Sequence, residues 1–400
     1  MQQKLQNREP IRIRERIRRI VVCLLLLLLP LGGVVWLNRD LASKTPPASS
    51  QLVFVPAKVT AVLSDNAEPD QENGEGRRVG TQELEIRILS GGHKDEILQM
   101  DNYLSALFNV DVDVGDRIIV RLITESDGSY YATMFNYDRG VVLGGVLLLF
   151  CVVLVLLGGR KGLRALGGLV YTLLCIWLLL IPGAICGLPP ILLTVVVVSL
   201  SAAASLIFVG GFSKKTLCAI CGCVGGGAVS ALVAAVAGWL MPLDGFNMSE
   251  AENLLLYGTE KGLTISGLMI CGVLIAALGA VMDVSMSIAS AEWELKTVHP
   301  EIAFRALFQS GMNIGRDAMG TMANTLILAF AGSSLNMLIL VQVYDIPFLQ
   351  LINTDFICVE VLQSMAGSLG ILLTVPLVAA LGALMMGGKS RTGVLHTQSK

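Results

Sequence analysis

Charge is scarce in this sequence of 400 residues, because only 15% of them are Asp, Glu, Lys or Arg. Soluble domains usually carry about a quarter of such residues. The deficit is concentrated after residue 139, so the length does not indicate two or three soluble domains. The net charge is −2, and no basic stripe interleaved with aromatic side chains is present. These absences exclude nucleic acid as an expected partner.

Histidine is nearly absent, and this removes several classes of enzyme. The three histidines are His93, His299 and His396, and none lies in an apolar run. A membrane metalloprotease needs HExxH, and a rhomboid-like enzyme needs a serine–histidine dyad, so both are excluded. The paired aspartates of a membrane aspartyl protease and the GxxxxGK[ST] loop of an ATP-driven pump are missing too. We therefore expect no enzyme activity, no catalytic residue and no cofactor.

Cysteine is missing from the segment that would need it for disulfides. Eight of the nine cysteines lie in apolar runs, Cys186 lies at the end of one, and residues 38–138 have none. This distribution excludes a disulfide framework. The CAICGC stretch, with Cys218, Cys221 and Cys223, has the wrong spacing for a closed zinc site and no second pair follows it. We expect packing roles for these three residues and no metal site.

Long apolar runs are what the sequence has in abundance. Hydrophobic residues make up 54% of the chain, and the mean hydropathy is +0.70. Eight runs are long enough to span a bilayer: 20–37, 140–158, 165–183, 189–210, 217–242, 262–289, 318–343 and 356–386. They predict a polytopic α-helical membrane protein whose first partner is the lipid bilayer. The first run follows a basic stretch, as in a signal peptide, but its length and the lack of a small-x-small cleavage site favour an uncleaved anchor.

Basic residues mark alternate loops between these runs. They occur in the N-terminus, at Arg160, Lys161 and Arg164, at Lys214 and Lys215, in the 305–316 stretch, and at Lys389 and Arg391. The positive-inside rule then predicts that both termini are cytoplasmic. The predicted organisation is a basic N-terminus (1–19), an anchor (20–37), a linker (38–50), an external domain (51–138), a seven-helix membrane domain (140–386) and a cytoplasmic tail (387–400).

The external segment is predicted to be a small β domain. Five stretches have strand character, and TQELEIRIL alternates as a half-buried strand does. They are 53–64, 81–90, 94–100, 117–124 and 129–136. Five short strands in about 85 residues suggest a small, OB-like barrel. Its aromatic residues either form a binding face or, as we favour, pack the barrel or meet the membrane surface: Tyr103, Tyr130, Tyr131, Phe135 and Tyr137.

Two carboxylates lie inside predicted spans, where a charge is expensive and a functional role is the default hypothesis. Asp283 lies in the inner part of the sixth span, and Glu360 lies in the outer part of the eighth. Each is either a proton- or ion-coupling group or a buried polar clamp.

The seventh span opens with five polar residues: Arg316, Asp317, Thr321, Asn324 and Thr325. Thr321 and Asn324 are predicted at the depth of Asp283, so the set either holds a proton or a small cation or makes interhelical hydrogen bonds worth about 1 kcal/mol each. Arg316 either pairs with Asp283 and keeps it ionised, or caps the interface with Asp317.

The segment between the sixth and seventh spans is predicted to be cytoplasmic. Glu292, Glu294 and His299 lack metal-site spacing, so we favour a solvated face for them. Ile302 and Leu307 share a helical face, which suggests an amphipathic helix on the membrane surface. The 42 glycines are interpreted mainly as helix-packing residues, and Pro376 leaves room for a moving helix.

These residues together resemble a known family. The pattern GALGAVMDVSMSIASA, then SGMNIGRDAMGTMANTLILAFAGSSL, then a glutamate upstream of GSLG is similar to the YibE/F family of bacterial multipass membrane proteins. The resemblance extends from the external GDRIIV strand to the last span. It implies a protein of the bacterial cytoplasmic membrane. Members are usually described as transporters without an established substrate, so no catalytic residue is carried over.

The expected function is that of a secondary transporter or permease for an unknown small molecule or ion. An anchor, an external domain and a bundle with an intramembrane aspartate are also similar in architecture to half of an RND-type permease or of SecD/SecF, although this chain has two more spans and a far smaller external domain. The alternative is a non-transporting scaffold whose external domain binds an envelope component or partner. A homo-oligomer is compatible with either function.

Overall fold

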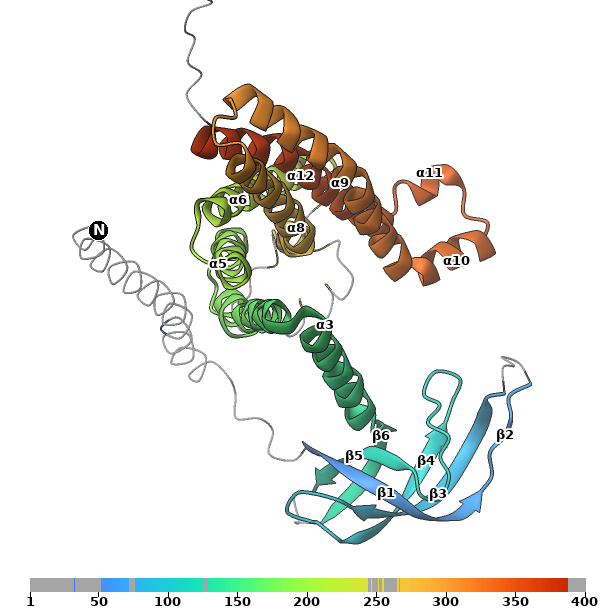
Figure 1. Cartoon of the computed structure of the whole chain (residues 1–400). Helices are drawn as coiled ribbons and strands as arrows, with labels where there is room; N and C mark the ends of the chain where they lie inside the picture. Colours follow the sequence, from blue (N-terminus) through green and yellow to red (C-terminus); the bar gives the residue numbers. More distant parts are fainter. Residues whose placement is uncertain are drawn as a thin grey trace, which may run out of the picture. The chain divides into compact units, whose positions relative to one another are not determined.

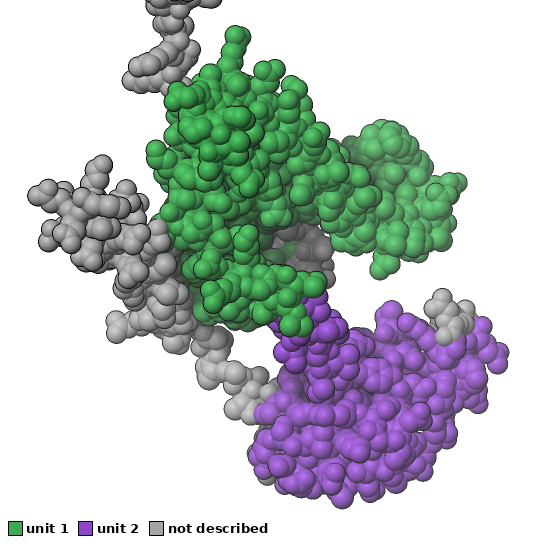
Figure 2. All heavy atoms as spheres, in the orientation of Figure 1, with its two compact units in different colours: residues 1–44, 154–400 green, residues 45–153 purple. Residues whose placement is uncertain are grey.

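The computed structural model describes residues 52–71, 76–125, 129–243 and 267–387, together with residues 32, 246, 251, 254 and 265. The predicted anchor at 20–37, the linker at 38–50 and the tail beyond residue 387 therefore lie outside the described residues, apart from residue 32. From residue 52 onward, the described residues divide into two compact units that meet between residues 153 and 154 (Figure 2).

The first unit is a curved antiparallel sheet that forms a half-barrel (Figure 1). Its strands are β1 (Leu52–Asp65), β2 (Glu68–Pro69), β3 (Arg78–Ile88), β4 (Ile97–Leu104), β5 (Arg117–Thr124) and β6 (Tyr130–Tyr137). β1 pairs with β3 on one side and with β5 on the other, while β4 extends the sheet beyond β3 and β6 extends it beyond β5. The predicted strands are present, and the OB-like character is not confirmed.

Alternating burial holds this sheet together. Leu84, Ile86 and Ile88 on β3 are fully buried, and Ile118 and Val120 on β5 face them in the same core. Each such side chain contributes roughly 1.5–3 kcal/mol when removed from water. The intervening residues stay closer to solvent, as the two-residue period of a strand requires.

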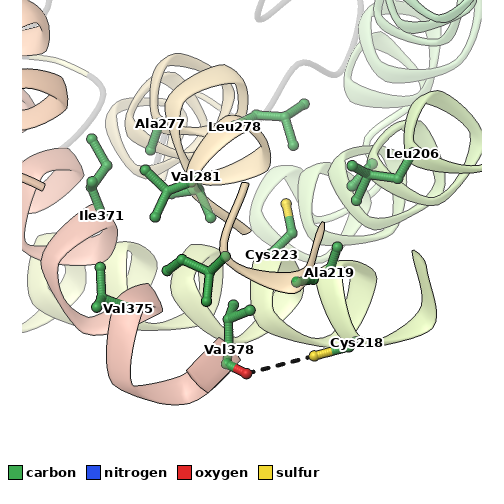
Figure 3. Close-up of a cluster of buried hydrophobic side chains, with 14 of the residues drawn as sticks. Leu206, Cys218, Ala219, Cys223, Ala277, Leu278, Val281, Ile371, Val375 and Val378 are labelled. Atoms are coloured by element: carbon green, nitrogen blue, oxygen red, sulfur yellow. Dashed lines mark hydrogen bonds between the residues drawn. The ribbon is translucent and has the colours of Figure 1, made fainter. Parts of the chain in front are cut away.

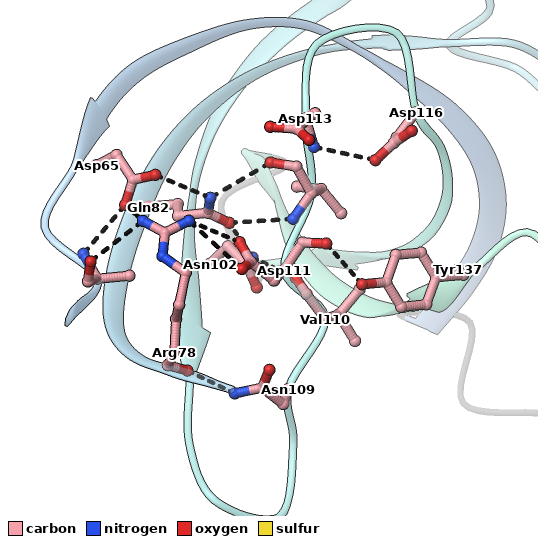
Figure 4. A network of polar contacts seen from close by, with 12 residues as sticks. Asp65, Arg78, Gln82, Asn102, Asn109, Val110, Asp111, Asp113, Asp116 and Tyr137 are labelled. Atoms are coloured by element: carbon pink, nitrogen blue, oxygen red, sulfur yellow. Dashed lines mark hydrogen bonds and ion pairs between the residues drawn. The ribbon is translucent and has the colours of Figure 1, made fainter. Parts of the chain in front are cut away.

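A polar network links β1, β3, β4 and the segment between β4 and β5 (Figure 4). The buried side chain of Asn102 donates to the Gln82 carbonyl at 3.0 Å and to the backbone carbonyl of Val110 at 2.8 Å. Arg78 bridges the carboxylates of Asp65 and Asp111. The hydrogen bond from the Arg78 guanidinium is the main reason why the pKa of Asp65 falls from its usual 3.8 to about 2.

The aromatic residues of the sheet divide between core and surface. Tyr130 and Tyr137 pack against the core, and the Tyr130 hydroxyl donates to the Glu96 carboxylate. Tyr103, Tyr131 and Phe135 are exposed. The favoured interpretation was that these rings pack the barrel or meet the membrane surface. Tyr130 and Tyr137 fit the first part, and contact of the exposed rings with the membrane stays a prediction.

The second unit is helical. Its elements are α3 (Gly140–Cys175, which begins in the first unit), a π-helical turn (Ile176–Leu180), α4 (Ile181–Ile185), α5 (Pro190–Gly210), α6 (Lys214–Leu240), α8 (Leu268–Val298), α9 (Phe304–Ser333), α10 (Leu335–Val343), α11 (Phe348–Leu351) and α12 (Asp355–Met386). Among the described residues, five helical segments are long and apolar enough to cross a membrane, or six if the bent pair α9–α10 is one span. The predicted count of eight is not confirmed.

Two boundaries differ from the predicted spans. The runs at 140–158 and 165–183 lie in one helical segment, Gly140–Ile185, which is interrupted at Gly159 by the non-helical angles φ 53° and ψ −133°. Glycine adopts this positive φ without the penalty that a β-carbon would add. The expected surface helix near Ile302 is also absent as a separate element, because Leu307 is already buried in the first turn of α9.

The helical core lies where α5, α6, α8 and α12 meet, and Figure 3 shows part of it. Cys218 and Cys223 of α6 are buried there, and the Cys218 thiol points to the Val378 carbonyl at 3.6 Å. α6 and α12 approach closely where Gly226 faces Thr374 and Gly370 faces Ser230. Small residues allow this backbone approach, which is the packing role predicted for the glycines. The packing role predicted for the three cysteines holds for Cys218 and Cys223, whereas Cys221 is exposed.

Candidate functional site

Asp283 lies on the face of α8 that points away from the helical core. Val281, Val284 and Ile288 of the same helix are buried, whereas Asp283 is exposed. It makes no hydrogen bond or ion pair with any residue that the structure describes, so the predicted pairing with Arg316 is not formed. The carboxylate is therefore open to whatever surrounds the chain at this depth.

The five polar residues of α9 are also exposed. The Thr321 hydroxyl donates to the Ala318 carbonyl at 2.9 Å, and the Thr325 hydroxyl donates to the Thr321 carbonyl at 2.8 Å, so both are satisfied within their own helix. The side chains of Arg316, Asp317 and Asn324 have no partner among the described residues. They do not converge with Asp283 on an internal cavity.

Glu360 lies apart from these residues, near the start of α12. It lines a pocket of about 180 Å³ together with Ser334, Phe330 and Ser364. The buried Ser334 hydroxyl lies within reach of the Glu360 carboxylate, but neither it nor Glu360 Oε2 makes a hydrogen bond of regular geometry with a described residue. The rest of the pocket lining is mostly apolar.

Glu292 is a residue that sequence reasoning missed, and the prediction of a solvated face is wrong for it. Its side chain is 0% exposed, and both carboxylate oxygens lack a partner among the described residues. The carboxyl group lies between α8, α9 and α12, in a space that exists because residues 311 and 382 are glycines. A β-carbon at Gly311 would overlap Oε1, and one at Gly382 would overlap Oε2.

No described residue places an opposite charge beside Glu292. Cys218 of α6 is close enough to interact with it electrostatically, and Ala379 of α12 packs beside it. No group of three or more histidine, cysteine or acidic residues that could hold a metal ion occurs in the described ranges. Glu294 and His299, the other two residues of the predicted set, are exposed.

A signal for Glu292 was present in the spacing along α8. Val281, Ser285, Ile288 and Glu292 recur at intervals of four, three and four residues, which places them on one helical face. All four are buried, and the Ser285 hydroxyl also lacks a partner among the described residues. One face of α8 thus carries three buried oxygen atoms without hydrogen bonds.

Comparison with known proteins covers most of the chain. Residues 146–388 match the family model described as YibE/F-like protein, and residues 56–137 match the model of the YibE/F family N-terminal domain. No curated protein and no solved structure gives a significant match. The boundary between the two matches coincides with the change from the half-barrel to the first long helix.

Proposed function

This chain is a member of the YibE/F family of membrane proteins, and from that premise we propose that it is a secondary transporter coupled to protons through Glu292. The observation that carries the proposal is a fully buried carboxyl group whose two oxygens have no partner among the described residues. The transported solute is a small molecule or ion whose identity the chain does not reveal.

The charge state of Glu292 follows from its burial and from the groups around it. An isolated ionised carboxylate costs tens of kcal/mol in a medium of low dielectric constant, so such a group becomes neutral instead. No described residue offers Glu292 an ion pair, and the only described titratable side chain within electrostatic range is the Cys218 thiol. In the packed arrangement of α8, α9 and α12, Glu292 therefore carries a proton.

Release of the proton from Glu292 requires that water reach its carboxyl group. Buried polar groups are almost always hydrogen-bonded, so unpaired ones call for an explanation such as water that enters in another state. Both Glu292 oxygens and the Ser285 hydroxyl would gain water if the α8 face separated from α12. In this seam, the contact of α8 with α9 and α12 around Glu292, residues 311 and 382 are glycines, so neither position places a side chain against the carboxyl group. The seam is closed when Glu292 is protonated and open when Glu292 is ionised. Release of the proton is therefore linked to movement of α8 relative to α12.

A proton that passes through Glu292 needs a path with one end on each side of the membrane. Lys214 and Lys215 begin α6 shortly before Cys218, and Arg305 lies in the first turn of α9 shortly before Gly311. Because Cys218 and Gly311 lie beside Glu292, basic residues gather at the Glu292 end. The positive-inside rule supports a cytoplasmic location for this end and for both termini. Glu360 lies 22 residues before Gly382 on α12, which is about 33 Å along a helix and close to the thickness of the hydrocarbon core. We assign Glu360 to the outer end of the path.

Cys218 provides a reporter for this proposal. It is buried near Glu292, whereas Cys221 of the same helix is exposed and serves as an internal reference. In the full protein reconstituted in vesicles, modification by a small maleimide is followed at each cysteine by mass spectrometry while the pH is raised. We expect Cys218 to gain reactivity relative to Cys221, because ionised Glu292 opens the seam.

The variant Glu292→Gln keeps the shape of the side chain and cannot ionise. We expect it to remove the pH-dependent gain at Cys218, whereas the control Glu294→Gln, an exposed residue two positions away, keeps it. In vesicles that contain a pH-sensitive dye, native protein should also collapse an imposed pH gradient faster than Glu292→Gln. Equal behaviour of native and Glu292→Gln proteins in both measurements would show that Glu292 is only a packing residue.

A scaffold function is the second candidate, and one surface of the half-barrel favours it. Leu107 is 89% exposed and Phe108 is 77% exposed on the loop after β4. Within this loop the Phe108 amide donates to the Ser105 hydroxyl and the Asn109 side chain donates to the Ser105 carbonyl. The sheet order, with β4 and β6 at the two edges and Tyr130 bonded to Glu96 between them, supports an OB-like reading of this domain. If this loop holds an envelope partner, Leu107→Ser should abolish function and Glu292→Gln should not.

A further inference from the structure

The outward face of α9 presents polar groups in one line. Asn313, Asp317, Gly320 and Asn324 recur at intervals of four, three and four residues, so they lie along a single seam of the helix. All four are exposed. The opposite face packs into the core through Gly315 and Met319, among others. We call the line Asn313–Asp317–Gly320–Asn324, with Arg316 at its flank, the α9 seam.

The α9 seam needs a cover that the described chain does not supply. None of the side chains of Asn313, Arg316, Asp317 and Asn324 has a hydrogen bond or ion pair with another described residue. A charged or amide side chain that faces lipid costs several kcal/mol, and so such groups in membrane helices face protein or water. The neighbouring α10, with the sequence LNMLILVQV, is mostly apolar and can face lipid without this cost.

The apolar segments of the chain are poor candidates for the cover. The run at 20–37 reads IVVCLLLLLLPLGGVVWL and contains no charged or amide side chain. The start of α3 is equally apolar. The α9 seam itself, by contrast, carries a cation next to an anion and two amides, which are groups that can satisfy one another.

We infer that the α9 seam is the contact surface for a second copy of this chain. Two copies inserted in the same direction are related by a two-fold axis along the membrane normal, so each residue meets the partner at its own depth. On either side of that axis, Arg316 then faces Asp317 of the partner subunit, which makes two ion pairs. Asn324 lies close to the axis and faces Asn324 of the partner subunit, which pairs the two amides.

The space at Gly320 fits this contact. A β-carbon at Gly320 would meet no atom within 4 Å, so the position is open in one copy of the chain. Between two copies, a glycine at the seam allows the backbones to approach and bring the flanking polar groups together. The same openness makes Gly320 a suitable place for a blocking substitution, because the position is exposed and an added β-carbon meets no atom of the same copy within 4 Å.

The test counts subunits of the purified full chain in vesicles at low protein density, by single-molecule photobleaching. We expect mostly two copies for native protein and mostly one for Gly320→Leu, with an unchanged thermal unfolding transition. Gly167→Leu is the matched control, since Gly167 is also exposed and open but lies in α3; it should stay dimeric. Oxidation should link two copies of Gly320→Cys and leave Gly167→Cys and native protein unlinked.

Charge exchange identifies the pairing. Arg316→Asp and Asp317→Arg should each weaken the dimer by about tenfold or more, because like charges then meet. The double exchange Arg316→Asp with Asp317→Arg should restore it. A monomer at all densities would mean that water covers the seam, and a dimer insensitive to Gly320→Leu and to the charge variants would place the interface elsewhere; either result overturns the inference. The inference does not depend on transport.

Discussion

In the half-barrel every buried polar side chain of the described residues is hydrogen-bonded, whereas in the helical unit some are bonded, such as Ser230 and Thr374, and others are not. In the half-barrel, Gln82 and Asn102 are buried and hydrogen-bonded to each other and to the backbone. In the helical unit, Ser285 and Glu292 are buried and have no partner among the described residues. The unpartnered buried side-chain oxygens of the described chain all belong to the helical unit. A complete network fixes one arrangement, whereas an incomplete one leaves groups available to water, a proton or another state.

Of the substitutions that compare the two units, we expect Gln82→Leu in the half-barrel to change stability most. Gln82→Leu leaves the Val112 carbonyl without the Gln82 donor, and the Asn102 amide keeps only its hydrogen bond to the Val110 carbonyl. We expect a loss of about 2–4 kcal/mol in the stability of this unit, because unpaired buried groups keep their full desolvation cost. Hydrogen–deuterium exchange of β3 and β4 in the full protein measures it. The exposed Gln99→Leu on β4 is the control, and equal exchange in the two variants would contradict the argument.

Replacement of Glu292 by an apolar residue is expected to raise stability, whereas replacement of Gln82 lowers it. Glu292→Leu removes two unpaired oxygens from the seam and keeps most of the side-chain volume, so it should stabilise the helical unit by about 1–3 kcal/mol. Thermal unfolding in detergent measures this change against native protein. A large destabilisation would show that Glu292 has a structural partner, and the contrast between the two units would disappear.

A smaller effect tests how closely Glu292 fits its space. Gly382→Ala places a methyl group against the Glu292 carboxyl group, and we expect a net loss of about 1 kcal/mol, since overpacking costs about 1–3 and alanine regains nearly 1 in helix propensity. In the Glu292→Ala background the loss should vanish. Gly279→Ala, where no atom lies within 4 Å, is the control and should stabilise slightly.

Patterns with a short period and one buried face were readable from the sequence. The strand predicted at 117–124 coincides with β5, and the span predicted at 356–386 coincides with α12 within one residue. A strand with one buried face alternates every two residues, and a membrane span is recognised by the length of its apolar run alone. Both patterns can therefore be recognised without knowledge of distant contacts. Hydropathy alone carries no signal for the break at Gly159 or for the bend of 60° between α9 and α10.

The acids of α8 show why the site was harder to predict than the fold. Hydropathy placed Asp283 inside a span and Glu292 outside it, and so favoured Asp283. In the structure α8 continues to Val298, and the two residues lie on opposite faces, with Asp283 exposed and Glu292 buried. Which face is buried depends on α9 and α12, which are close to α8 only after folding. The helical spacing of Val281, Ser285, Ile288 and Glu292 would have predicted which of the two acids is buried.

The smallest expected effect concerns the charged edge of the half-barrel network and is a dependence on pH. The Arg78 guanidinium lowers the pKa of Asp65 from 3.8 to about 2. Because the folded pKa is the lower one, the contribution of Asp65 to stability is fully present above about pH 4 and is lost as the pH falls through 2. Hydrogen–deuterium exchange of β3 in full-length protein, corrected for intrinsic rates, should therefore increase between pH 4 and pH 2 in native protein and increase less in Asp65→Asn. An identical acid dependence in the two proteins would show that Arg78 bridges two carboxylates without stabilising the fold, and the completeness ascribed to this network would then rest on Gln82 and Asn102 alone.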